Sequence, residues 1–523
     1  MGLVSASHLA RSTVRQLIEL GVSNFVLSPG SRNAPLAIAL HEAYKEDLID
    51  LHVKIDERGA AFFALGISKA TDNYVAVICT SGTAVANYHP AALEAYHSQS
   101  KIIFLTADRP ARLRKTGANQ TTLQNGILAP LQTTDTADQI DCSLLLTGGP
   151  VHINLQFDEP LLEKDSNADW LAGITNKKVN EIIDTSGDLQ VSPHSIIIIG
   201  HDCAGLSKEL INRVVRASGL PFIAEDPLSF SGATPHAAIF LADDLLRETL
   251  KADEIVVIGR TTLSRSINTF IAQSPRTIVI DPRVKEIDTG REASQLLFKL
   301  PAIHPTSLDS QWNDLWENAG NLAEKSLELN WSEQFVAREI ARQIPDGSAL
   351  FIGSSRPVRD LEALAQPREG IHTFANRGLA GIDGNISTAF GIATTTQRAY
   401  SIIGDLTFLH DLSALTNASS GNHTIFIIDN NGGGIFSTLP QAGAEGFEQI
   451  FGTPHNLNLE SIIKGFGCSV EKVKTGSDLA RTFNHPGLHF VIVEVPSREE
   501  NAKNLKDLHQ RVISAVRIGS NLA

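Results

Sequence analysis

The fold class follows from the stretch Ser401-Ile402-Ile403-Gly404-Asp405-Leu406 and from Asn430-Asn431-Gly432-Gly433-Gly434, which begins 25 positions after Asp405. Each stretch comes at the end of a short run of β-branched and apolar residues, and a helical pattern lies between the two runs. Strand, helix and strand in this order form a βαβ unit, in which both strands lie parallel in one sheet. We therefore predict an α/β fold that binds ligands beyond the carboxyl ends of its strands.

The same alternation of strands and helices extends over the rest of the chain in three blocks. Strands are expected at residues 24–28, 51–55, 75–79 and 101–106, at 195–200, 221–225, 255–259 and 277–281, and at 349–353, 400–404, 424–429 and 490–495. These blocks predict three doubly wound parallel-sheet domains with the boundaries 1–180, 190–340 and 345–523. Residues 83–97 are expected to be helical, and 161–191 and 301–331 to be irregular connections.

The composition is that of a soluble globular protein, with 42% hydrophobic and 20% charged residues among 523. The formal charge of −14 disfavours nucleic acids and anionic membranes, which bind basic surfaces. The four cysteines include no CxxC pair, which excludes a zinc or redox site of that type. Because no signal-peptide pattern and no apolar run of membrane-spanning length occur, we expect a cytoplasmic protein without a membrane span.

Oxygen ligands gather at the two strand ends. Because neighbouring parallel strands end at the same edge of a sheet, Asp405 and Asn430 are expected to lie side by side. A carboxylate, an amide oxygen and a backbone carbonyl are hard ligands that suit Mg²⁺, with a diphosphate completing the shell. The alternative is that Gly-Asp and Asn-Gly are ordinary strand-end turns. The sequence contains neither a Walker A motif nor a GxGxxG motif, so neither of these nucleotide-binding modes is expected.

The spacing of Asp405 and the Asn-Asn pair resembles the thiamine-diphosphate motif of the decarboxylase and acetolactate-synthase superfamily. The resemblance implies a glutamate after a strand of the first block, and Glu57 in Lys54-Ile55-Asp56-Glu57-Arg58-Gly59 fits this position. Taken alone, Glu57 would be a carboxylate that the helix dipole favours at a helix start. Gly-Asp-Leu stands where the superfamily usually has Gly-Asp-Gly, and no His-His pair of the pyruvate decarboxylase type occurs.

Further stretches are similar to one family of this superfamily, the 2-succinyl-5-enolpyruvyl-6-hydroxy-3-cyclohexene-1-carboxylate synthases of menaquinone biosynthesis. They are Ser28-Pro29-Gly30-Ser31-Arg32-Asn33-Ala34-Pro35-Leu36, Thr80-Ser81-Gly82-Thr83-Ala84, Thr106-Ala107-Asp108-Arg109-Pro110, Gly117-Ala118-Asn119-Gln120-Thr121, Asn376-Arg377-Gly378, Gly381-Ile382-Asp383-Gly384 and Gly404-Asp405-Leu406-Thr407-Phe408-Leu409-His410-Asp411. The middle block matches the family only in general character. The resemblance implies a pyrimidine-binding domain at 1–180, a central α/β domain at 190–340 and a diphosphate-binding domain at 345–523.

The resemblance implies thiamine diphosphate as cofactor, held together with Mg²⁺ or Mn²⁺. Glu57 would hydrogen-bond the aminopyrimidine as a buried carboxylate, because desolvation raises the pKa of such a group. The metal would be bound by Asp405, Asn430 and the Gly432 carbonyl. Further contacts to the cofactor are expected from Ile382, Gly404, Leu406, Ile435 and Phe436.

The substrates implied by the resemblance are 2-oxoglutarate and isochorismate. The enzyme, a transferase, would decarboxylate the first and add the succinyl carbanion 1,4 to the second. Arginine forks bind carboxylates through two hydrogen bonds, and the family's positions match several arginines here. The succinyl side would be formed by Ser355, Arg359 and Arg377, and the isochorismate side by Ser31, Arg32, Arg109 and Gln120, with Arg265 from the middle block. Catalytic roles are expected for Glu57, Arg32, Gln120, Ser355, Arg359 and Arg377.

Two alternatives remain open at this point. An acetolactate synthase-like enzyme or a 2-hydroxyacyl lyase would not need Arg32, Arg109, Arg359 and Arg377 together. A non-catalytic relative would keep the fold without needing the proton relay of Glu57. The superfamily places the cofactor between the first domain of one subunit and the third of another, so a homodimer or a dimer of dimers is implied. Whether menaquinone or phylloquinone is the end product is left open.

Overall fold

The computed structural model describes residues 5–162, 169–174, 186–283, 293–418 and 421–520. The chain divides into two compact units. The first comprises residues 1–182, 378–396 and 410–420, and the second comprises 183–377, 397–409 and 421–523. The three-domain division expected from the sequence stays a prediction.

The first unit is built on one six-stranded, all-parallel sheet with the order β2-β1-β3-β4-β6-β5. Its strands are β1 (Asn24–Leu27), β2 (Asp50–Val53), β3 (Val75–Cys79), β4 (Ile102–Asp108), β5 (Thr133–Thr136) and β6 (Val151–Gln156). Strands β3 and β4 are buried along their whole length, as their apolar sequences require between two covering layers. The predicted α/β class is therefore confirmed for this part of the chain.

Helices of the first unit are α1 (Ala6–Glu19), α2 (Ala34–Lys45), α3 (Glu57–Thr71), α4 (Thr83–Asn87), α5 (His89–Ser98) and α13 (Asn385–Ala393). The stretch 83–97, expected as one helix, forms two helices that meet at Tyr88. A proline in the first turn of α5 explains this break, because proline suits a helix start and disrupts a helix interior. Short 3₁₀ turns cover Ala111–Leu113, Cys142–Leu144 and Leu412–Asn417, the last labelled η3.

Helices α3 and α13 pack against each other at two glycines. A Cβ atom on Gly66 would lie 2.1 Å from the Thr388 carbonyl oxygen, and one on Gly391 would lie 2.1 Å from the Phe63 carbonyl oxygen. No side chain fits at such separations, so glycine at both positions permits the close helix contact. This packing fixes the helix that begins with Glu57 against the helix that follows Gly384.

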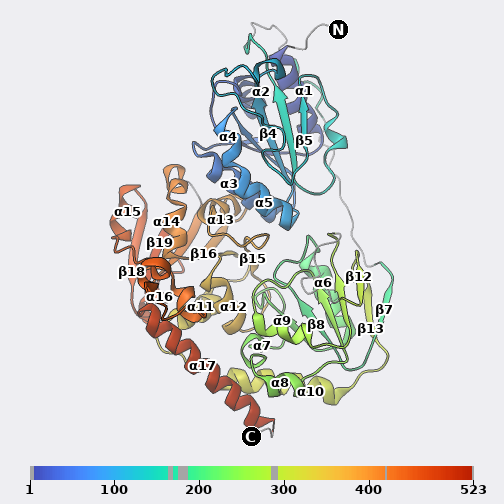
Figure 1. Ribbon diagram of the computed structural model, residues 1–523, viewed down its shortest axis with the longest axis vertical. Helices are drawn as coiled ribbons and strands as arrows, with labels where there is room; N and C mark the ends of the chain where they lie inside the picture. The colour runs from blue at the N-terminus through green and yellow to red at the C-terminus, as the bar shows by residue number, and fades with distance from the viewer. Residues whose placement is uncertain (1–4, 163–168, 175–185, 284–292, 419–420, 521–523) are drawn as a thin grey trace. The chain divides into compact units, whose positions relative to one another are not determined.

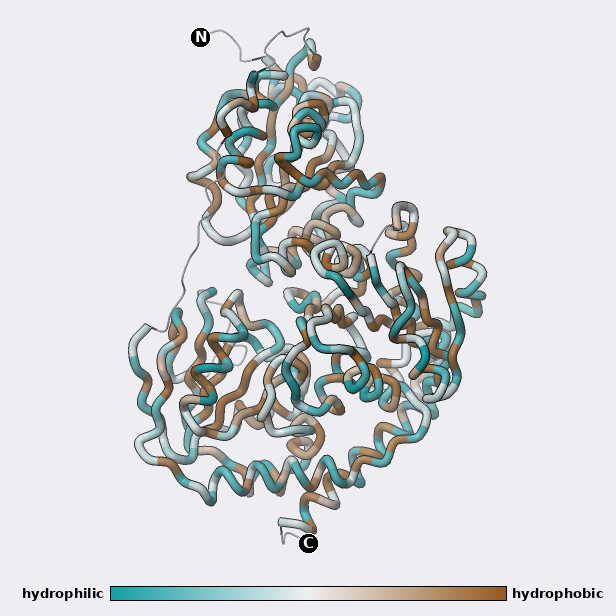
Figure 2. The backbone as a smooth tube through the Cα atoms, turned by 180° about the vertical axis from the view of Figure 1, so that it is seen from behind, coloured by the Kyte–Doolittle hydropathy of each residue, from teal (hydrophilic) through white to brown (hydrophobic). Residues whose placement is uncertain are grey.

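In its described residues, the second unit contains a five-stranded and a six-stranded parallel sheet, together with a two-stranded parallel pair. One has the order β12-β11-β10-β8-β9, from β8 (Ser195–Ile199), β9 (Phe222–Ala224), β10 (Glu254–Ile258), β11 (Thr277–Ile280) and β12 (Gln295–Leu297). The other has the order β15-β14-β16-β17-β19-β18, from β14 (Ala349–Ile352), β15 (His372–Phe374), β16 (Arg398–Gly404), β17 (Asn422–Asp429), β18 (Ser469–Val473) and β19 (Leu488–Glu494). Figure 2 shows brown hydrophobic stretches of the chain alternating with teal hydrophilic ones. Strands β8, β10 and β11 are buried along their whole length, as doubly covered parallel sheets require.

Helices of the second unit are α6 (Lys208–Ser218), α7 (Ala237–Phe240), α8 (Asp244–Thr249), α9 (Arg265–Ala272), α10 (Ser310–Lys325), α11 (Glu333–Gln343), α12 (Arg356–Leu364), α14 (Asp405–His410), α15 (Leu459–Gly465), α16 (Gly476–Leu479) and α17 (Arg498–Gly519), with short helical turns η4 (Gly434–Thr438) and η5 (Glu448–Gly452). The long helix α17, red in Figure 1, packs against α7 and α10 and against α11 and η4. It thereby joins the helices around both sheets.

Both stretches expected to be irregular contain regular elements. Within 301–331, Asp309 caps the 16-residue helix α10, whose Trp312 and Trp316 are buried at helical spacing. The predicted linker 161–191 lies partly outside the described residues, but its end forms β7 (Asp188–Val191), which pairs with β13 (Ala302–Pro305). The expectation of irregular structure is wrong for 301–331, because an N-cap followed by aromatic residues at helical spacing forms a helix there, and for 188–191, which form a strand.

Candidate functional site

Strands β16 and β17 pair in parallel, with Gly404 opposite Ile428, and end at the same edge of the sheet. Asp405 begins α14 directly after β16, and Asn430 follows the last residue of β17. The Asp405 carboxylate accepts the Gly432 N–H at 2.8 Å and the Leu406 N–H at 2.6 Å. The predicted neighbourhood of these two strand ends is thus observed.

The two polar atoms of the Asn430 side chain differ in their hydrogen bonding. Its Nδ2 donates to Glu333 Oε1 at 2.6 Å, while its buried Oδ1 has no hydrogen-bond partner among the described residues. The Gly432 carbonyl accepts the Gly434 N–H at 3.0 Å and keeps a second lone pair. A buried amide oxygen without a partner costs free energy, so this donor set fits a divalent cation that would use the oxygen.

The glycines after Asn430 are required by close neighbours. Gly432 has φ +138°, and a Cβ there would lie 2.1 Å from the Gly452 carbonyl oxygen. A Cβ on Gly434 would lie 2.4 Å from Asn430 Nδ2. Larger residues would therefore displace either the chain at Gly452 or the amide of Asn430.

Three groups of this site were missed by the sequence reasoning. Asp429 and His455 lie with Asp405 so that one ligand atom of each falls within 4.8 Å of the others. The hydrogen bond to Asp405 raises the pKa of His455, and burial together with Asp405 raises the pKa of Asp429. Glu333 is buried, and desolvation, reinforced by Asp360, raises its pKa to about 7. Asp429 could have been found beside Asn430, but nothing near Glu333 or His455 signals the site.

Glu57 is the first residue of α3, and Asp56 caps the helix by accepting the Arg58 N–H at 3.0 Å. The described contact of the Glu57 carboxylate is Asn87 Nδ2, at 3.5 Å from Oε2. The side chain is half-buried in the chain by itself, so the buried carboxylate expected at the shared cofactor site stays a prediction. The first turn of a helix leaves the carboxylate open on one side.

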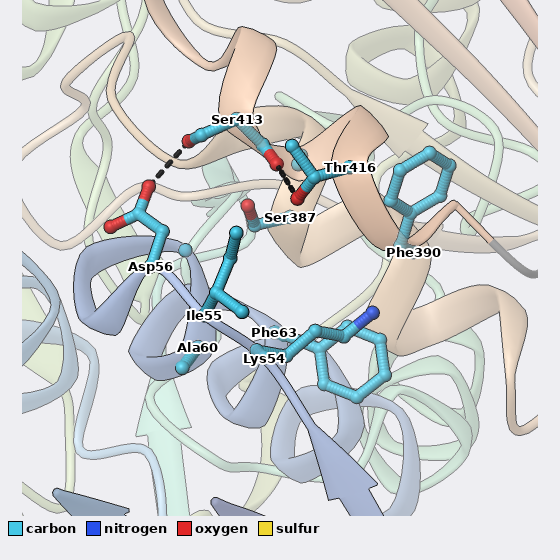
Figure 3. Close-up of a pocket in the computed structure, with 11 residues that line it drawn as sticks. Lys54, Ile55, Asp56, Ala60, Phe63, Ser387, Phe390, Ser413 and Thr416 are labelled. Atoms are coloured by element: carbon cyan, nitrogen blue, oxygen red, sulfur yellow. Dashed lines mark hydrogen bonds between the residues drawn. The ribbon is translucent and has the colours of Figure 1, made fainter. Parts of the chain in front are cut away.

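A pocket of about 290 Å³, including space open to solvent, lies beside the start of α3. Figure 3 shows Asp56 turned toward Ser413, to which it is hydrogen-bonded, and Lys54 extended along the Phe63 ring. The Lys54 Nζ lies 4.4 Å from the centre of that ring, a cation–π geometry. Ser387 and Phe390 of α13 and residues of η3 form the opposite wall. The pocket thus lies between α3, the helix that begins with Glu57, and the two elements α13 and η3.

The residues predicted on the isochorismate side gather within the first unit. Arg109 Nη1 donates to the Gln120 carbonyl at 2.7 Å and to Ser81 Oγ at 2.5 Å. Arg32 is buried and donates to the Phe157 carbonyl at 3.0 Å. Desolvation and the positive charge of Arg32 lower the pKa of Arg109. Ser31, which precedes Arg32 in the chain, is exposed. Two guanidinium groups that repel each other would be stabilised by an anion bound between them.

The residues predicted on the succinyl side gather within the second unit. Ser355 has φ +77° at the start of α12, and its carbonyl accepts from Arg359 Nη1 at 2.6 Å. Arg377 is buried and donates to Thr262 Oγ1 at 3.1 Å and to the Thr262 carbonyl at 2.9 Å. Glu225 accepts hydrogen bonds from the Thr262 and Leu263 N–H groups. Burial lowers the pKa of Arg359, and the negative charge of Glu225 opposes part of this effect. The loop of the middle block thus reaches Arg377 through Thr262.

The other predicted residues occupy mixed environments. Arg265 is exposed at the first residue of α9, and Thr262 instead contacts Arg377. Ile382 is half-buried before α13 in the first unit. Leu406 and the residues Ile435 and Phe436 of η4 are half-buried in the second unit, where the Phe436 ring lies 5.6 Å from the Phe451 ring. In the described part of the chain, no helix is both long enough and apolar enough to cross a bilayer.

Comparisons with known proteins agree with these observations. Residues 7–128 match the family described as thiamine pyrophosphate enzyme, N-terminal TPP binding domain, and 358–495 match the C-terminal TPP binding domain. The chain is 36% identical to a 2-succinyl-5-enolpyruvyl-6-hydroxy-3-cyclohexene-1-carboxylate synthase of Nocardioides sp., over 96% of this chain and 97% of that protein. The protein of the same name from Thermobifida fusca is 34% identical, over 97% of this chain and 99% of that protein.

The fold also has solved relatives. A thiamine diphosphate-dependent 4-hydroxybenzoylformate decarboxylase from Rhodococcus jostii superposes with a TM-score of 0.68. The identity is 15%, with 95% of this chain and 100% of that chain covered, so this likeness concerns the fold alone. It confirms the predicted α/β class of the thiamine-diphosphate enzyme type.

Proposed function

Because the chain belongs to the 2-succinyl-5-enolpyruvyl-6-hydroxy-3-cyclohexene-1-carboxylate synthase family, we propose that it catalyses the reaction after which that family is named. It takes 2-oxoglutarate and isochorismate, releases CO2 and joins the remaining succinyl unit to isochorismate in a 1,4 sense. The product serves the biosynthesis of menaquinone or phylloquinone. An acetolactate synthase or a 2-hydroxyacyl lyase is not favoured, because the relatives that match over nearly their full length are named 2-succinyl-5-enolpyruvyl-6-hydroxy-3-cyclohexene-1-carboxylate synthase.

The diphosphate end of the cofactor would be held by the second unit. Asp405, Asn430 and the Gly432 carbonyl fit Mg²⁺, or Mn²⁺ in its place, because the Asn430 Oδ1 is buried and open to a ligand. Gly404, Leu406, Ile435 and Phe436 surround these ligands along the chain. Thiamine diphosphate, when bound, supplies the electron sink that decarboxylation of a 2-oxo acid needs.

The protein's own part in the chemistry is the movement and placement of charge. Glu57 would hold a proton at the aminopyrimidine N1′, a task for a carboxylate presented from a rigid helix start. Ile382 would support the shape of the bound cofactor by an apolar contact. Ser355, Arg359 and Arg377 would hold the carboxylate of 2-oxoglutarate, with Arg265 from the middle block near the same side.

The isochorismate carboxylates would be bound by Arg32 and Arg109, with Ser31 and Gln120 beside them. The observation that carries the proposal is the presence of two arginine groups, Arg32 with Arg109 and Arg359 near Arg377. Two substrates with two carboxylates each require two such groups, whereas pyruvate-type substrates require fewer.

One incubation tests this function. Purified protein, Mg²⁺ and thiamine diphosphate are mixed with 2-oxoglutarate and isochorismate, and the product is identified by mass spectrometry. We expect the succinylated adduct and CO2 in equal amounts, and neither product when isochorismate and 2-oxoglutarate are replaced by pyruvate. Turnover of pyruvate without turnover of 2-oxoglutarate would refute the proposal.

The assembly we propose is a homodimer, or a dimer of dimers, in the cytoplasm. Support comes from the start of α3, where Glu57 is half-buried while Val53 and Ile55 are 51% and 63% exposed. Apolar side chains beside a catalytic carboxylate suit burial against a second copy.

Subunit mixing tests the shared cofactor site. Glu57→Gln and Asp405→Ala subunits are each expected to be inactive as homodimers at a thiamine diphosphate concentration that saturates only the wild-type protein. If one subunit provides Glu57 and the other provides Asp405, random mixing restores about one quarter of wild-type activity, because half of the dimers then contain one intact site. Sites formed within one chain would give no recovery on mixing, and that result would exclude the shared site.

A further inference from the structure

We infer that His455 and Glu333 are positioning residues, which orient Asp405 and Asn430 for the metal ion. This inference rests on the proposed cofactor function, because it assigns roles around the same metal site. Neither residue belongs to a motif that the sequence reasoning connected with the site. Both lie in the second unit, where their contacts are described directly.

His455 is fixed in one tautomer. The Leu457 N–H donates to His455 Nδ1 at 3.0 Å, so Nδ1 must be the acceptor and Nε2 carries the proton in the neutral ring. The Nε2–H group then donates to Asp405 Oδ2 at 3.3 Å. The Gly432 N–H reaches the same oxygen at 2.8 Å. Asp405 is thereby oriented from two sides.

The segment that carries His455 is bound to the ligand loop itself. Asn431 Nδ2 donates to Asn456 Oδ1 and the Asn456 N–H donates to Asn431 Oδ1, both at 2.9 Å. The Gly433 N–H donates to the Gly452 carbonyl at 2.8 Å. These paired contacts place His455 relative to Asn430 and Gly432 with little freedom, even though 25 residues separate Asn431 from Asn456.

Glu333 performs the matching task at Asn430. A side-chain amide has a donor end and an acceptor end, and the hydrogen bond from Nδ2 to Glu333 Oε1 selects which end faces the site. Glu333 is itself held, because it begins α11 and its N–H donates to Asn501 Oδ1 at 3.1 Å. The buried Oδ1 is consequently presented as a ligand atom.

Partners that orient metal ligands typically change metal affinity by about 10- to 100-fold when they are removed. We therefore expect His455→Ala and Glu333→Ala to raise the Mg²⁺ concentration for half-maximal thiamine diphosphate binding by about this factor. His455→Gln and Glu333→Gln keep a donor and an acceptor, respectively, and should restore most of the affinity. A purely structural role would not be rescued so selectively.

The experiment is a calorimetric titration of full-length protein with thiamine diphosphate at a series of Mg²⁺ concentrations. Thermal unfolding without Mg²⁺ reports whether each variant is folded. His304→Ala is the matched control, because His304 also contacts a carboxylate, Asp188 at 3.1 Å, on the β13–β7 pair. It should bind cofactor like the wild type.

The outcomes separate the inference from the proposed function. A wild type that binds no thiamine diphosphate with Mg²⁺ would overturn both. A wild type that binds, beside folded alanine variants with unchanged Mg²⁺ dependence, would overturn the positioning roles alone. Electron paramagnetic resonance with Mn²⁺ and thiamine diphosphate supplies a second readout. We expect no directly coordinated imidazole nitrogen, and a nitrogen signal lost in His455→Ala would replace the positioning role by direct ligation.

Discussion

The metal-ligand loop at 429–434 and the start of α3 would serve the same cofactor, yet the chain holds them very differently. Asp405 accepts two backbone N–H groups and a histidine N–H, and Asn430 is held by Glu333. Glu57, in contrast, has a described hydrogen bond of 3.5 Å and is half-buried.

The metal-ligand loop is a prebuilt region, in which the ligands are oriented before the cofactor binds. The surroundings of Glu57 are incomplete in the chain by itself. A metal site gains affinity when its ligands are already oriented, because little order is lost on binding. A proton-transferring carboxylate needs a desolvated setting, and the chain alone does not provide this for Glu57. The remaining cover is therefore expected to come from the cofactor and a second subunit. The following predictions test each side of that comparison.

Glu57→Gln should produce the largest effect. Without the carboxyl proton relay, turnover is expected to fall by about 10²- to 10⁴-fold, the usual contribution of general acid–base catalysis. Cofactor binding should remain close to wild type, because the prebuilt metal region is untouched. Steady-state kinetics and calorimetry measure the two quantities. Near-wild-type turnover would remove Glu57 from the proton relay, and lost cofactor binding would contradict the division between the regions.

Asp405→Ala should show the opposite pattern. Loss of a charged ligand is expected to weaken Mg²⁺-dependent cofactor binding by about 100-fold or more, beyond the effect of removing an outer partner. At saturating cofactor, the remaining turnover should recover in part, because the proton relay is intact. Calorimetry over a range of Mg²⁺ concentrations checks this. An unchanged affinity would exclude Asp405 from the metal site.

Local sequence patterns predict the residues of the site that directly follow strands. Asp405 and Asn430 each follow a strand, and strand adjacency then brings them together. The same reasoning could not find Glu333 or His455. Glu333 reaches Asn430 from a helix 97 positions earlier, and His455 is placed by contacts of a loop with another loop. Such placements depend on tertiary packing, which periodicity does not encode.

The middle block illustrates the same limit. The loop after β10 places Thr262 in contact with Arg377, a contact that the sequence does not predict, whereas the substrate contact expected of Arg265 stays a prediction. The Thr262 hydroxyl and backbone carbonyl accept hydrogen bonds from the Arg377 guanidinium, and neither group stands out in the sequence as a charged residue does. Helix α10, in contrast, has a cap and an aromatic spacing that the sequence does show.

Gly432→Ala should test how tightly the ligand loop is built. The added Cβ would overlap the Gly452 carbonyl, and φ of +138° disfavours any side chain. We expect a loss of about 2–3 kcal/mol in the free energy of unfolding together with weaker Mg²⁺ binding. Gly465→Ala is the control, because a Cβ there meets open space. Equal stability of both variants in urea unfolding would show that the loop is less constrained than its contacts indicate.

Arg377→Ala and Arg109→Ala should separate the two substrate sides. Loss of a charged hydrogen bond to a carboxylate costs about 1.5–3 kcal/mol, so kcat/KM should fall by about 10- to 100-fold. Arg377→Ala should act on the KM for 2-oxoglutarate, and Arg109→Ala on the KM for isochorismate. Initial rates with each substrate varied in turn measure this. Identical effects on both substrates would contradict two separate anion sites.

Asp411→Asn should give the smallest effect, a change in pH dependence at the Glu57 side. Desolvation raises the pKa of buried Asp411 to about 6, although its carboxylate accepts the Ser387 N–H at 2.8 Å and lies 3.8 Å from Arg58. Because the folded pKa exceeds the unfolded value of 3.8, the folded state binds the proton more tightly. This contribution to stability is present at low pH and disappears as the pH rises from about 4 to 6.

The asparagine should remove that slope, worth about 1–3 kcal/mol, while it still accepts the Ser387 N–H. Urea unfolding at pH 4.5 and 7.5 compares wild type, Asp411→Asn and the exposed control Asp314→Asn. We expect the difference between the two pH values to shrink only in Asp411→Asn. If the slope persists there, Asp411 is ionised in the folded protein at both pH values. The contact with Arg58 would then anchor the start of α3 as a stable ion pair, and the Glu57 side would be more prebuilt than the described hydrogen bond of Glu57 indicates.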